Sequence, residues 1–109
     1  MIKAQNIIKS FPSGDKELTV LKGISFEVPS GQFISITGRS GSGKSTLMYQ
    51  MGLLDHPTSG RVLVDGVDVT DLPAEERTQI RLEDLGYVFQ DYALIPELTA
   101  LENVLVPLL

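Results

Sequence analysis

An α/β fold is predicted by this 109-residue sequence, and three observations carry the prediction. A glycine-rich motif at residues 38–45 lies between an apolar run and a helical pattern. Alternating apolar and polar residues indicate strands both before and after that motif. Helical signals follow at residues 73–83 and again from residue 99. Strands interleaved with helices are typical of α/β domains.

The motif itself, Gly38-Arg39-Ser40-Gly41-Ser42-Gly43-Lys44-Ser45, matches G-x-x-x-x-G-K-[ST], the phosphate-binding P-loop. Its inner glycines let the backbone turn tightly and let phosphate oxygens approach closely. Successive N–H groups then form an anion-binding concavity at the start of a helix. Lys44 is predicted to reach the β- and γ-phosphates of a nucleotide, and the Ser45 hydroxyl to ligate Mg²⁺.

The surroundings of the motif favour this interpretation over a glycine- and serine-rich connecting loop that contains a lysine by chance. The motif follows Phe33–Thr37, which reads as a buried strand. A predicted helix, Lys44–Leu54, comes after it, with apolar residues at i, i+1, i+4 and i+7: Leu47, Met48, Met51 and Leu54. Strand, loop and helix in this order are the context that a P-loop requires.

The remaining elements are predicted from alternation, turn residues and capping signals. Strands are expected at residues 2–8, 24–28, 61–65 and 86–90, with extended chain at 67–69. Clusters of Pro, Gly, Ser and Asp at 10–16, 29–31 and 56–60 predict turns. Pro73, Glu75 and Glu76 suit the first turn of a helix at 73–83. Thr99 and Glu102 form a capping box that opens a last helix.

Composition bounds the class of protein. The chain is 42% hydrophobic and 21% charged, so residues 1–109 are expected to form one small globular unit. A net charge of -5 and scattered basic residues argue against a nucleic-acid partner. Cysteine is absent, which excludes disulfides and thiolate metal sites. No apolar run approaches the roughly 20 residues that span a bilayer, so we expect a soluble chain that meets a membrane through a partner.

Four segments, in order, give the chain a resemblance to a known family. They are the P-loop at 38–45, the run from Leu53 to Gly66, the strand Gly86-Tyr87-Val88-Phe89-Gln90, and the run from Leu94 to Val104. Together they resemble the N-terminal half of an ABC transporter ATP-binding subunit. The last run is similar to the lipoprotein-releasing and macrolide-export branch.

The resemblance implies a P-loop NTPase-like parallel sheet core with an antiparallel β-subdomain, truncated after the first half of the domain. It implies ATP and Mg²⁺ as cofactors. Its expected partners are a transmembrane permease subunit or domain and a second ATP-binding subunit. The expected location is cytoplasmic, peripheral to the inner or plasma membrane through the permease.

Particular positions take roles from the same resemblance. Phe11 is placed where an aromatic ring stacks on adenine; its alternative is a core or turn residue. Gln90 is placed where a glutamine contacts Mg²⁺ and the attacking water; its alternative is an ordinary polar residue after a strand. The expected catalytic residues are thus Lys44 and Gln90, and the expected metal ligands are Ser45 and Gln90. The remaining positions implied in nucleotide binding are Gly38, Ser40, Gly41, Ser42, Gly43, Lys44, Ser45 and Thr46.

Motifs of the second half of that family are missing from this sequence. A signature motif of LSGGQ type, a strand ending in Asp-Glu and the switch histidine are absent, so we expect little ATP hydrolysis by this chain alone. His56 does not match that switch histidine; it lies in a turn after a helix, where a cation is favourable. Glu75 and Glu76 are interpreted as a solvated helix face rather than an acid–base pair.

The end of the sequence, Val104-Leu105-Val106-Pro107-Leu108-Leu109, is apolar, whereas domain boundaries usually fall in polar chain. We therefore expect an interrupted domain, marginal as a monomer, with uncovered apolar residues. Three interpretations stay open: part of a transporter ATPase, a non-catalytic module that binds nucleotide or a partner, and an incomplete gene product without function. The encoding DNA beyond Leu109 would discriminate between them.

Overall fold

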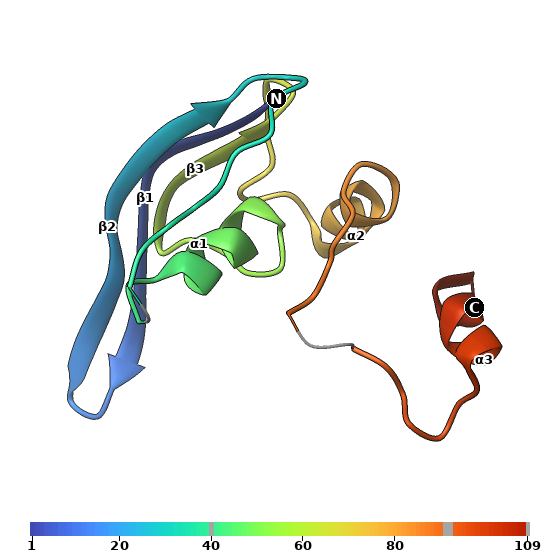
Figure 1. Cartoon of the computed structure of the whole chain (residues 1–109). Helices are drawn as coiled ribbons and strands as arrows, with labels where there is room; N and C mark the ends of the chain where they lie inside the picture. The colour runs from blue at the N-terminus through green and yellow to red at the C-terminus, as the bar shows by residue number, and fades with distance from the viewer. Residues whose placement is uncertain (40, 91–92, 109) are drawn as a thin grey trace.

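A computed structural model describes residues 1–39, 41–90 and 93–108 of the chain. The elements within these ranges follow one another as shown in Figure 1. Their bounds are β1 Ile2–Ser13, β2 Lys16–Val28, α1 Lys44–Met51, β3 Ser59–Val64, β4 Val67–Asp68, α2 Ala74–Glu83, α3 Ala100–Leu105 and a 3₁₀ helix Val106–Leu108.

The four strands form one antiparallel sheet in the order β2-β1-β3-β4, so β1 is flanked on both sides. The hairpin from β1 to β2 turns at Gly14, whose φ is 63°. The hairpin from β3 to β4 turns at Asp65 and Gly66, both with positive φ, as two-residue Asp-Gly hairpin turns require. The predicted strands at 2–8, 24–28 and 61–65 are therefore confirmed, and the first two are parts of longer strands.

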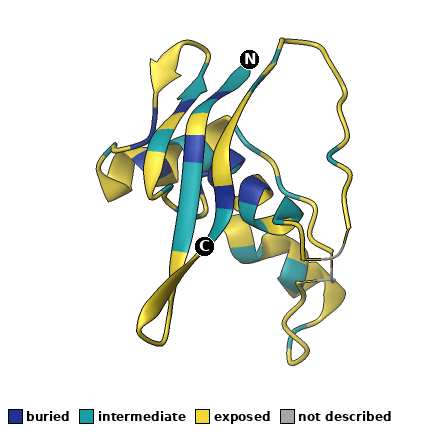
Figure 2. Ribbon diagram, turned by 90° about the vertical axis from the view of Figure 1, so that its left-hand side faces the viewer, coloured by how far each residue is buried: buried dark blue, intermediate teal, exposed yellow. Residues whose placement is uncertain are grey.

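The core lies where α1 packs across this sheet, and Figure 2 shows the buried residues gathered there. Leu47 and Met51 supply it from α1. The other buried apolar residues come from the strands and from the segments that follow α1 and β4: Ala4, Ile7, Leu21, Leu53, Val62 and Val69. Burial of these side chains is what holds the P-loop helix against the sheet.

The outer face of α1 differs from the prediction. The helix begins at Lys44 as expected but ends at Met51, three residues before the predicted Leu54. Met48 remains 55% exposed, because the sheet covers only one face of α1; Leu54 lies beyond the end of the helix and is 43% exposed. The side chain that joins Leu47 and Met51 on the buried face is Gln50, at the i+3 position.

Two predicted strands are not paired in the part of the chain that the structure describes. Residues 33–37 and 86–90 run as irregular chain, and neither belongs to the sheet. Phe33 is 99% exposed although the apolar pattern predicts burial. An apolar run is buried as a strand only where a ladder neighbour and packed faces exist, and no described strand lies in register beside either segment.

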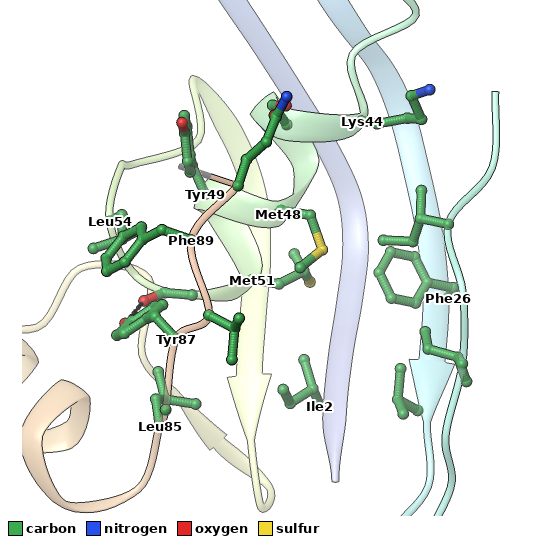
Figure 3. A pocket seen from close by; sticks show the side chains of 18 residues that line it. Ile2, Phe26, Lys44, Met48, Tyr49, Met51, Leu54, Leu85, Tyr87 and Phe89 are labelled. Carbon is green, nitrogen blue, oxygen red and sulfur yellow. Dashed lines mark hydrogen bonds between the residues drawn. The ribbon is translucent and has the colours of Figure 1, made fainter. Parts of the chain in front are cut away.

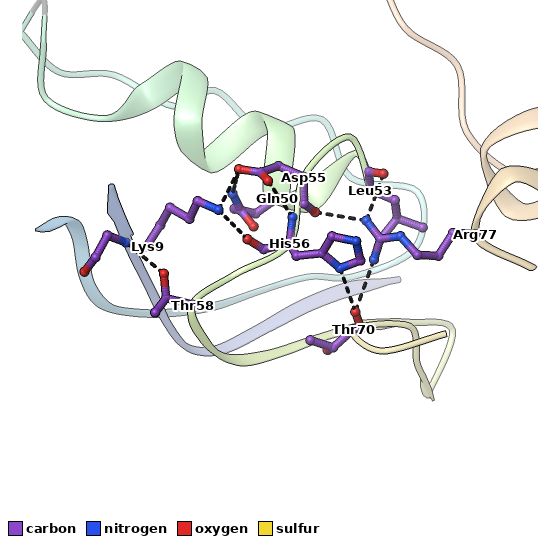
Figure 4. A network of polar contacts seen from close by, with 9 residues as sticks. Lys9, Gln50, Leu53, Asp55, His56, Thr58, Thr70 and Arg77 are labelled. Atoms are coloured by element: carbon purple, nitrogen blue, oxygen red, sulfur yellow. Dashed lines mark hydrogen bonds and ion pairs between the residues drawn. The ribbon is translucent and has the colours of Figure 1, made fainter. Parts of the chain in front are cut away.

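A polar network ties β1 to the end of α1 (Figure 4). The Lys9 ammonium lies 3.0 Å from a carboxylate oxygen of Asp55 and donates to the His56 carbonyl at 2.8 Å. Asp55 also accepts hydrogen bonds from the Gln50 amide and the His56 N–H. Burial alone would raise the pKa of Asp55, but the bonds from Lys9, His56 and Gln50 outweigh it and lower that pKa.

Arg77 extends the network to α2 and is only 4% exposed. Its guanidinium donates to the carbonyls of Leu53 and Asp55, at 3.0 and 2.9 Å. It also donates to the carbonyls of Val69 and Thr70, at 3.3 and 3.2 Å. One planar side chain thus joins α2 to two loops, and burial lowers its pKa without discharging a group so basic.

The later helices begin where their signals predict. Pro73 precedes the first residue of α2, with Glu75 and Glu76 in its first turn. Thr99 caps α3, and both hydrogen bonds of the capping box are formed. Figure 1 shows α3 lying apart from the sheet, with Val104 and Leu108 72% and 80% exposed. No helix among the described residues has the length and apolar character needed to cross a bilayer.

Replacing Arg77 by leucine should lower the free energy of unfolding by about 2–4 kcal/mol, because buried carbonyls would lose their donors. The matched control is Arg61→Leu, since Arg61 is largely exposed and faces Asp68 at 3.8 Å; it should cost less than about 1 kcal/mol. Urea unfolding followed by circular dichroism measures both. Equal losses would show that the buried network does not hold α2 in place.

Candidate nucleotide-binding site

The predicted P-loop closes on itself in front of α1. The Ser42 N–H donates to the Arg39 carbonyl at 3.1 Å, and the Lys44 ammonium folds back to donate to the Gly38 carbonyl. A Cβ at Gly38 would lie 2.7 Å from the Ser42 hydroxyl, so a side chain there would have to displace that hydroxyl. The lysine is thus held over the loop rather than extended into solvent. Ser40, also predicted to bind nucleotide, lies outside the described residues.

The start of α1 is open to an anion. Gly43 is the residue before the helix, in a left-handed conformation with φ 99°, and glycine offers no side chain to cap the first turn. The first turn also carries no acidic residue. The backbone N–H groups of that turn and the positive end of the helix dipole therefore face the loop, as a phosphate site requires.

A β-bulge in β2 supports Gly43. Lys9 pairs with Leu21 and Ser10 pairs with Thr19, so Val20 is an extra residue without a partner on β1. A Cβ added to Gly43 would lie 2.9 Å from Val20 Cγ1 and 3.2 Å from Leu21 Cδ2. Two consecutive side chains therefore contact the same point of the loop, which a regular strand would not allow.

Phe11 lies further along the same pair of strands. It pairs with Leu18, beyond the bulge at Val20 that contacts the loop. Its ring is 38% exposed, and the Lys9 ammonium lies 5.2 Å from the ring centroid. A cation at this distance is attracted to an aromatic face. Phe11 is thus neither a core residue nor a turn residue; it is a partly exposed ring on the strand pair that seats the P-loop.

A cavity of about 650 Å³ opens beside α1, and Figure 3 shows its lining. Lys44 and Ser45 line it from the start of α1, and Gln90 lines it from the segment after residue 85. The structure therefore brings together the predicted catalytic and metal residues, from positions 45 residues apart. Most of the remaining lining is apolar, including Met48, Phe26 and Phe89.

Ser45 and Gln90 are exposed, while Thr46, which follows Ser45 on α1, is half-buried. Hydroxyl and amide oxygens are the hard donors that Mg²⁺ accepts. The described residues contain no cluster of three or more His, Cys, Asp or Glu side chains that could hold a metal by themselves. His56 does not join the site; its Nδ1 lies 3.4 Å from the Thr70 carbonyl.

Two residues of this region were not singled out as site residues by sequence reasoning. Val20 contacts Gly43 only because of a bulge, and a bulge leaves no sure signal in one sequence. Tyr87 donates its hydroxyl to the Gly52 carbonyl at the end of α1. Burial raises the pKa of Tyr87, with Arg81 and Arg77 opposing, so the phenol stays a hydrogen-bond donor. Its aromatic position in an apolar run predicts packing, not this bond.

Fold and loop together define an α/β domain of the P-loop NTPase type with an antiparallel β-subdomain, and comparisons with known proteins agree. A family model described as "ABC transporter" matches residues 21–106. The solved cassette MJ0796 of Methanocaldococcus jannaschii, in a dimeric post-hydrolysis state bound to ADP and Pi, is 45% identical with a TM-score of 0.92. That match covers 99% of this chain and 47% of the cassette. The chain belongs to the ABC transporter family.

Curated relatives point the same way. The lipoprotein-releasing system ATP-binding protein LolD of Aquifex aeolicus is 50% identical over 109 residues, all of this chain and 47% of LolD. The macrolide export ATP-binding/permease protein MacB of Brucella abortus is 50% identical over 107 residues, 98% of this chain and 17% of MacB. The chain thus spans about half the length of LolD and about a sixth of MacB. The predicted resemblance and fold class are confirmed.

The contact between Gly43 and β2 can be tested by substitution. Gly41→Ala should cost about 1 kcal/mol of stability, because Gly41 has positive φ but open space around it. Gly43→Ala should cost about 2–3 kcal/mol, because the added Cβ also meets Val20. Urea unfolding measures each change.

A double substitution separates packing from backbone strain at this contact. Val20→Ala should cost less in the Gly43→Ala background than in the wild type, since it removes the atom that the new Cβ meets. If Val20→Ala costs the same in both backgrounds, the bulge does not support the loop.

Proposed function

We propose that the chain binds ATP with Mg²⁺ through residues 38–46, as part of an ABC transporter ATPase that powers export or lipoprotein release through a membrane partner. The observation that carries the proposal is the closed P-loop. An ammonium held over the loop, glycines that leave room for phosphate oxygens and an uncapped helix start occur at one place. Each of these features favours a polyphosphate, and together they leave little else that the loop would suit.

The residues around the loop fit the rest of the nucleotide. Ser45 and Gln90 offer oxygen ligands to Mg²⁺ at one end of the cavity beside α1. Phe11 offers a ring for adenine beyond the point where Val20 meets the loop. Lys9 is attracted to that ring, so it orients the ring that would stack on the base. Bound Mg²⁺ would neutralise phosphate charge, and Lys44 would add a second cation there.

The relatives support the partners. LolD is named as the ATP-binding protein of a lipoprotein-releasing system, and MacB as a macrolide export protein that joins an ATP-binding part to a permease. The M. jannaschii cassette is described as dimeric. We therefore propose a transmembrane permease and a second ATP-binding subunit as partners, and a place on the cytoplasmic side of the membrane. These partners belong to a larger assembly, and this chain matches about half of one ATP-binding cassette in it.

Lys44→Ala should abolish ATP affinity, because it removes the main positive charge near the γ-phosphate. Equilibrium binding of a fluorescent ATP analogue to the two proteins measures this. Lys22→Ala is the matched control, since Lys22 is exposed and, as the residue after Leu21 on β2, has its side chain on the face opposite the one that contacts the loop. Equal affinities of wild type and Lys44→Ala would remove the P-loop assignment.

The wild type and the Lys44→Ala variant also show whether the chain hydrolyses ATP or only binds it. Phosphate release from ATP should be no faster for the wild type than for Lys44→Ala. Steady release that disappears in the variant would show that the chain hydrolyses ATP without the missing motifs.

If adenine stacks on Phe11, substitutions of Phe11 should change ATP affinity and thermal stability differently. Phe11→Ala should weaken ATP binding about ten-fold, in the range of base–aromatic stacking, and Phe11→Tyr should retain it. Thermal stability should change little in Phe11→Tyr, which keeps the ring that Lys9 contacts. A loss of stability in Phe11→Ala with unchanged ATP affinity would assign Phe11 to packing instead.

A further inference from the structure

The end of α1 and the segment that carries Gln90 meet at one contact. The Tyr87 hydroxyl donates to the Gly52 carbonyl, which is one of the last carbonyls of α1 and lacks a partner within the helix. The edge of the Tyr87 ring lies directly on Gly52, where a Cβ would come within 2.8 Å of Cε1. Gly52 has φ -87°, which any residue adopts, so space rather than conformation requires glycine here.

The chain beyond Tyr87 lines the cavity outside any strand, and it bends at Gln90. The rings of Tyr87 and Phe89 stack with centroids 6.2 Å apart and planes 18° apart, while Val88 between them is fully exposed. Side chains that alternate in this way are typical of extended chain. In Figure 3 the segment ascends from Leu85 past Tyr87 and Phe89 toward the end of the cavity that holds Lys44 and Tyr49.

The helix from Gly52 back to Ser45 and the chain from Tyr87 to Gln90 have a similar reach. From Gly52 back to Ser45 the helix spans seven residues, or about 10 Å. From Tyr87 to Gln90 three residues reach at most about 10 Å. Ser45 and Gln90 line the same cavity as Gly52 and Tyr87. The two runs share one contact, that of Tyr87 with Gly52, and their far residues Ser45 and Gln90 line the same cavity within a similar reach of that contact.

We infer that Tyr87 is a positioning residue, whose contact with Gly52 fixes the register of residues 87–90 along α1 and so brings the Gln90 amide to the metal side of Ser45. The inference rests on the proposed function, because the metal belongs to the proposed nucleotide. A shift of one residue in the extended chain moves a side chain by about 3.3 Å and turns it to the opposite side. Loss of the contact would therefore affect Mg²⁺ binding before it affects the phosphate loop.

The first experiment compares ATP affinity with and without Mg²⁺. Tyr87→Phe keeps the ring and removes the hydrogen bond; it should leave Mg²⁺-free ATP affinity unchanged and reduce the gain in affinity on adding Mg²⁺ about five-fold. Gln90→Ala should show the same pattern, and the double variant should be no worse than Gln90→Ala. Tyr49→Phe removes a hydroxyl from the same cavity and is the matched control, with no change expected.

Additive effects of Tyr87→Phe and Gln90→Ala on the Mg²⁺ gain would overturn the inference, because two independent residues would then act. The inference also fails if Tyr87→Phe lowers melting temperature and Mg²⁺-free affinity while the Mg²⁺ gain is kept. Such a result would make Tyr87 a packing residue only.

The second experiment needs no nucleotide, so it tests the positioning even if the wild type fails to bind ATP. The chain has no cysteine, so Met48→Cys and Val88→Cys, both at exposed positions, can be spin-labelled specifically. We expect a narrow dipolar distance distribution in this background, and a broad or shifted one after Tyr87→Phe or Gly52→Ala. Gly86→Ala is the control, because a Cβ there meets nothing within 4 Å. Unchanged spectra in both test variants would overturn the inference.

Discussion

Burial of one face of α1 against an antiparallel sheet is the contact on which the rest of this molecule depends. Leu47 and Met51 press the helix against Ile7, Leu21 and their neighbours, and that places the helix start beside the bulge of β2. The position of the phosphate loop is therefore set largely by apolar packing behind it, through α1 and through the contact of Gly43 with Val20 and Leu21.

Polar contacts then extend this arrangement in two directions from the end of α1. On one side, Lys9 and Asp55 hold the turn after the helix to β1. On the other side, Arg77 gathers four carbonyls and holds α2 to the same turn. Buried charges of this kind cost desolvation energy, which their multiple hydrogen bonds offset. They give the end of the helix a defined place, and Tyr87 uses one carbonyl from that end.

The sequence predicts the parts of this structure that depend on local pattern. The P-loop residues, the first residue of α1, three of the strands and the capping box at Thr99 follow from residue types at fixed spacing. Phe33 shows the limit, because an apolar run carries no information on whether a neighbouring strand exists to cover it. Arg77 shows another, since its carbonyl partners are 7 to 24 residues away and carry no side-chain signal. Long-range backbone contacts are invisible to periodicity.

At the bulge around Val20, regular pairing of β1 with β2 and support of the phosphate loop have opposing requirements. Deleting Val20 would let β1 and β2 pair without interruption at this point, and a regular ladder satisfies more backbone groups. The same deletion would leave Leu21 alone against Gly43, and the glycine in the left-handed region would lose its contact with Val20. Selection for strand pairing alone would therefore remove a residue that the loop needs. Consensus-style stabilisation of this hairpin should spare that position, because the most stable sheet and the best-formed loop are specified by different sequences.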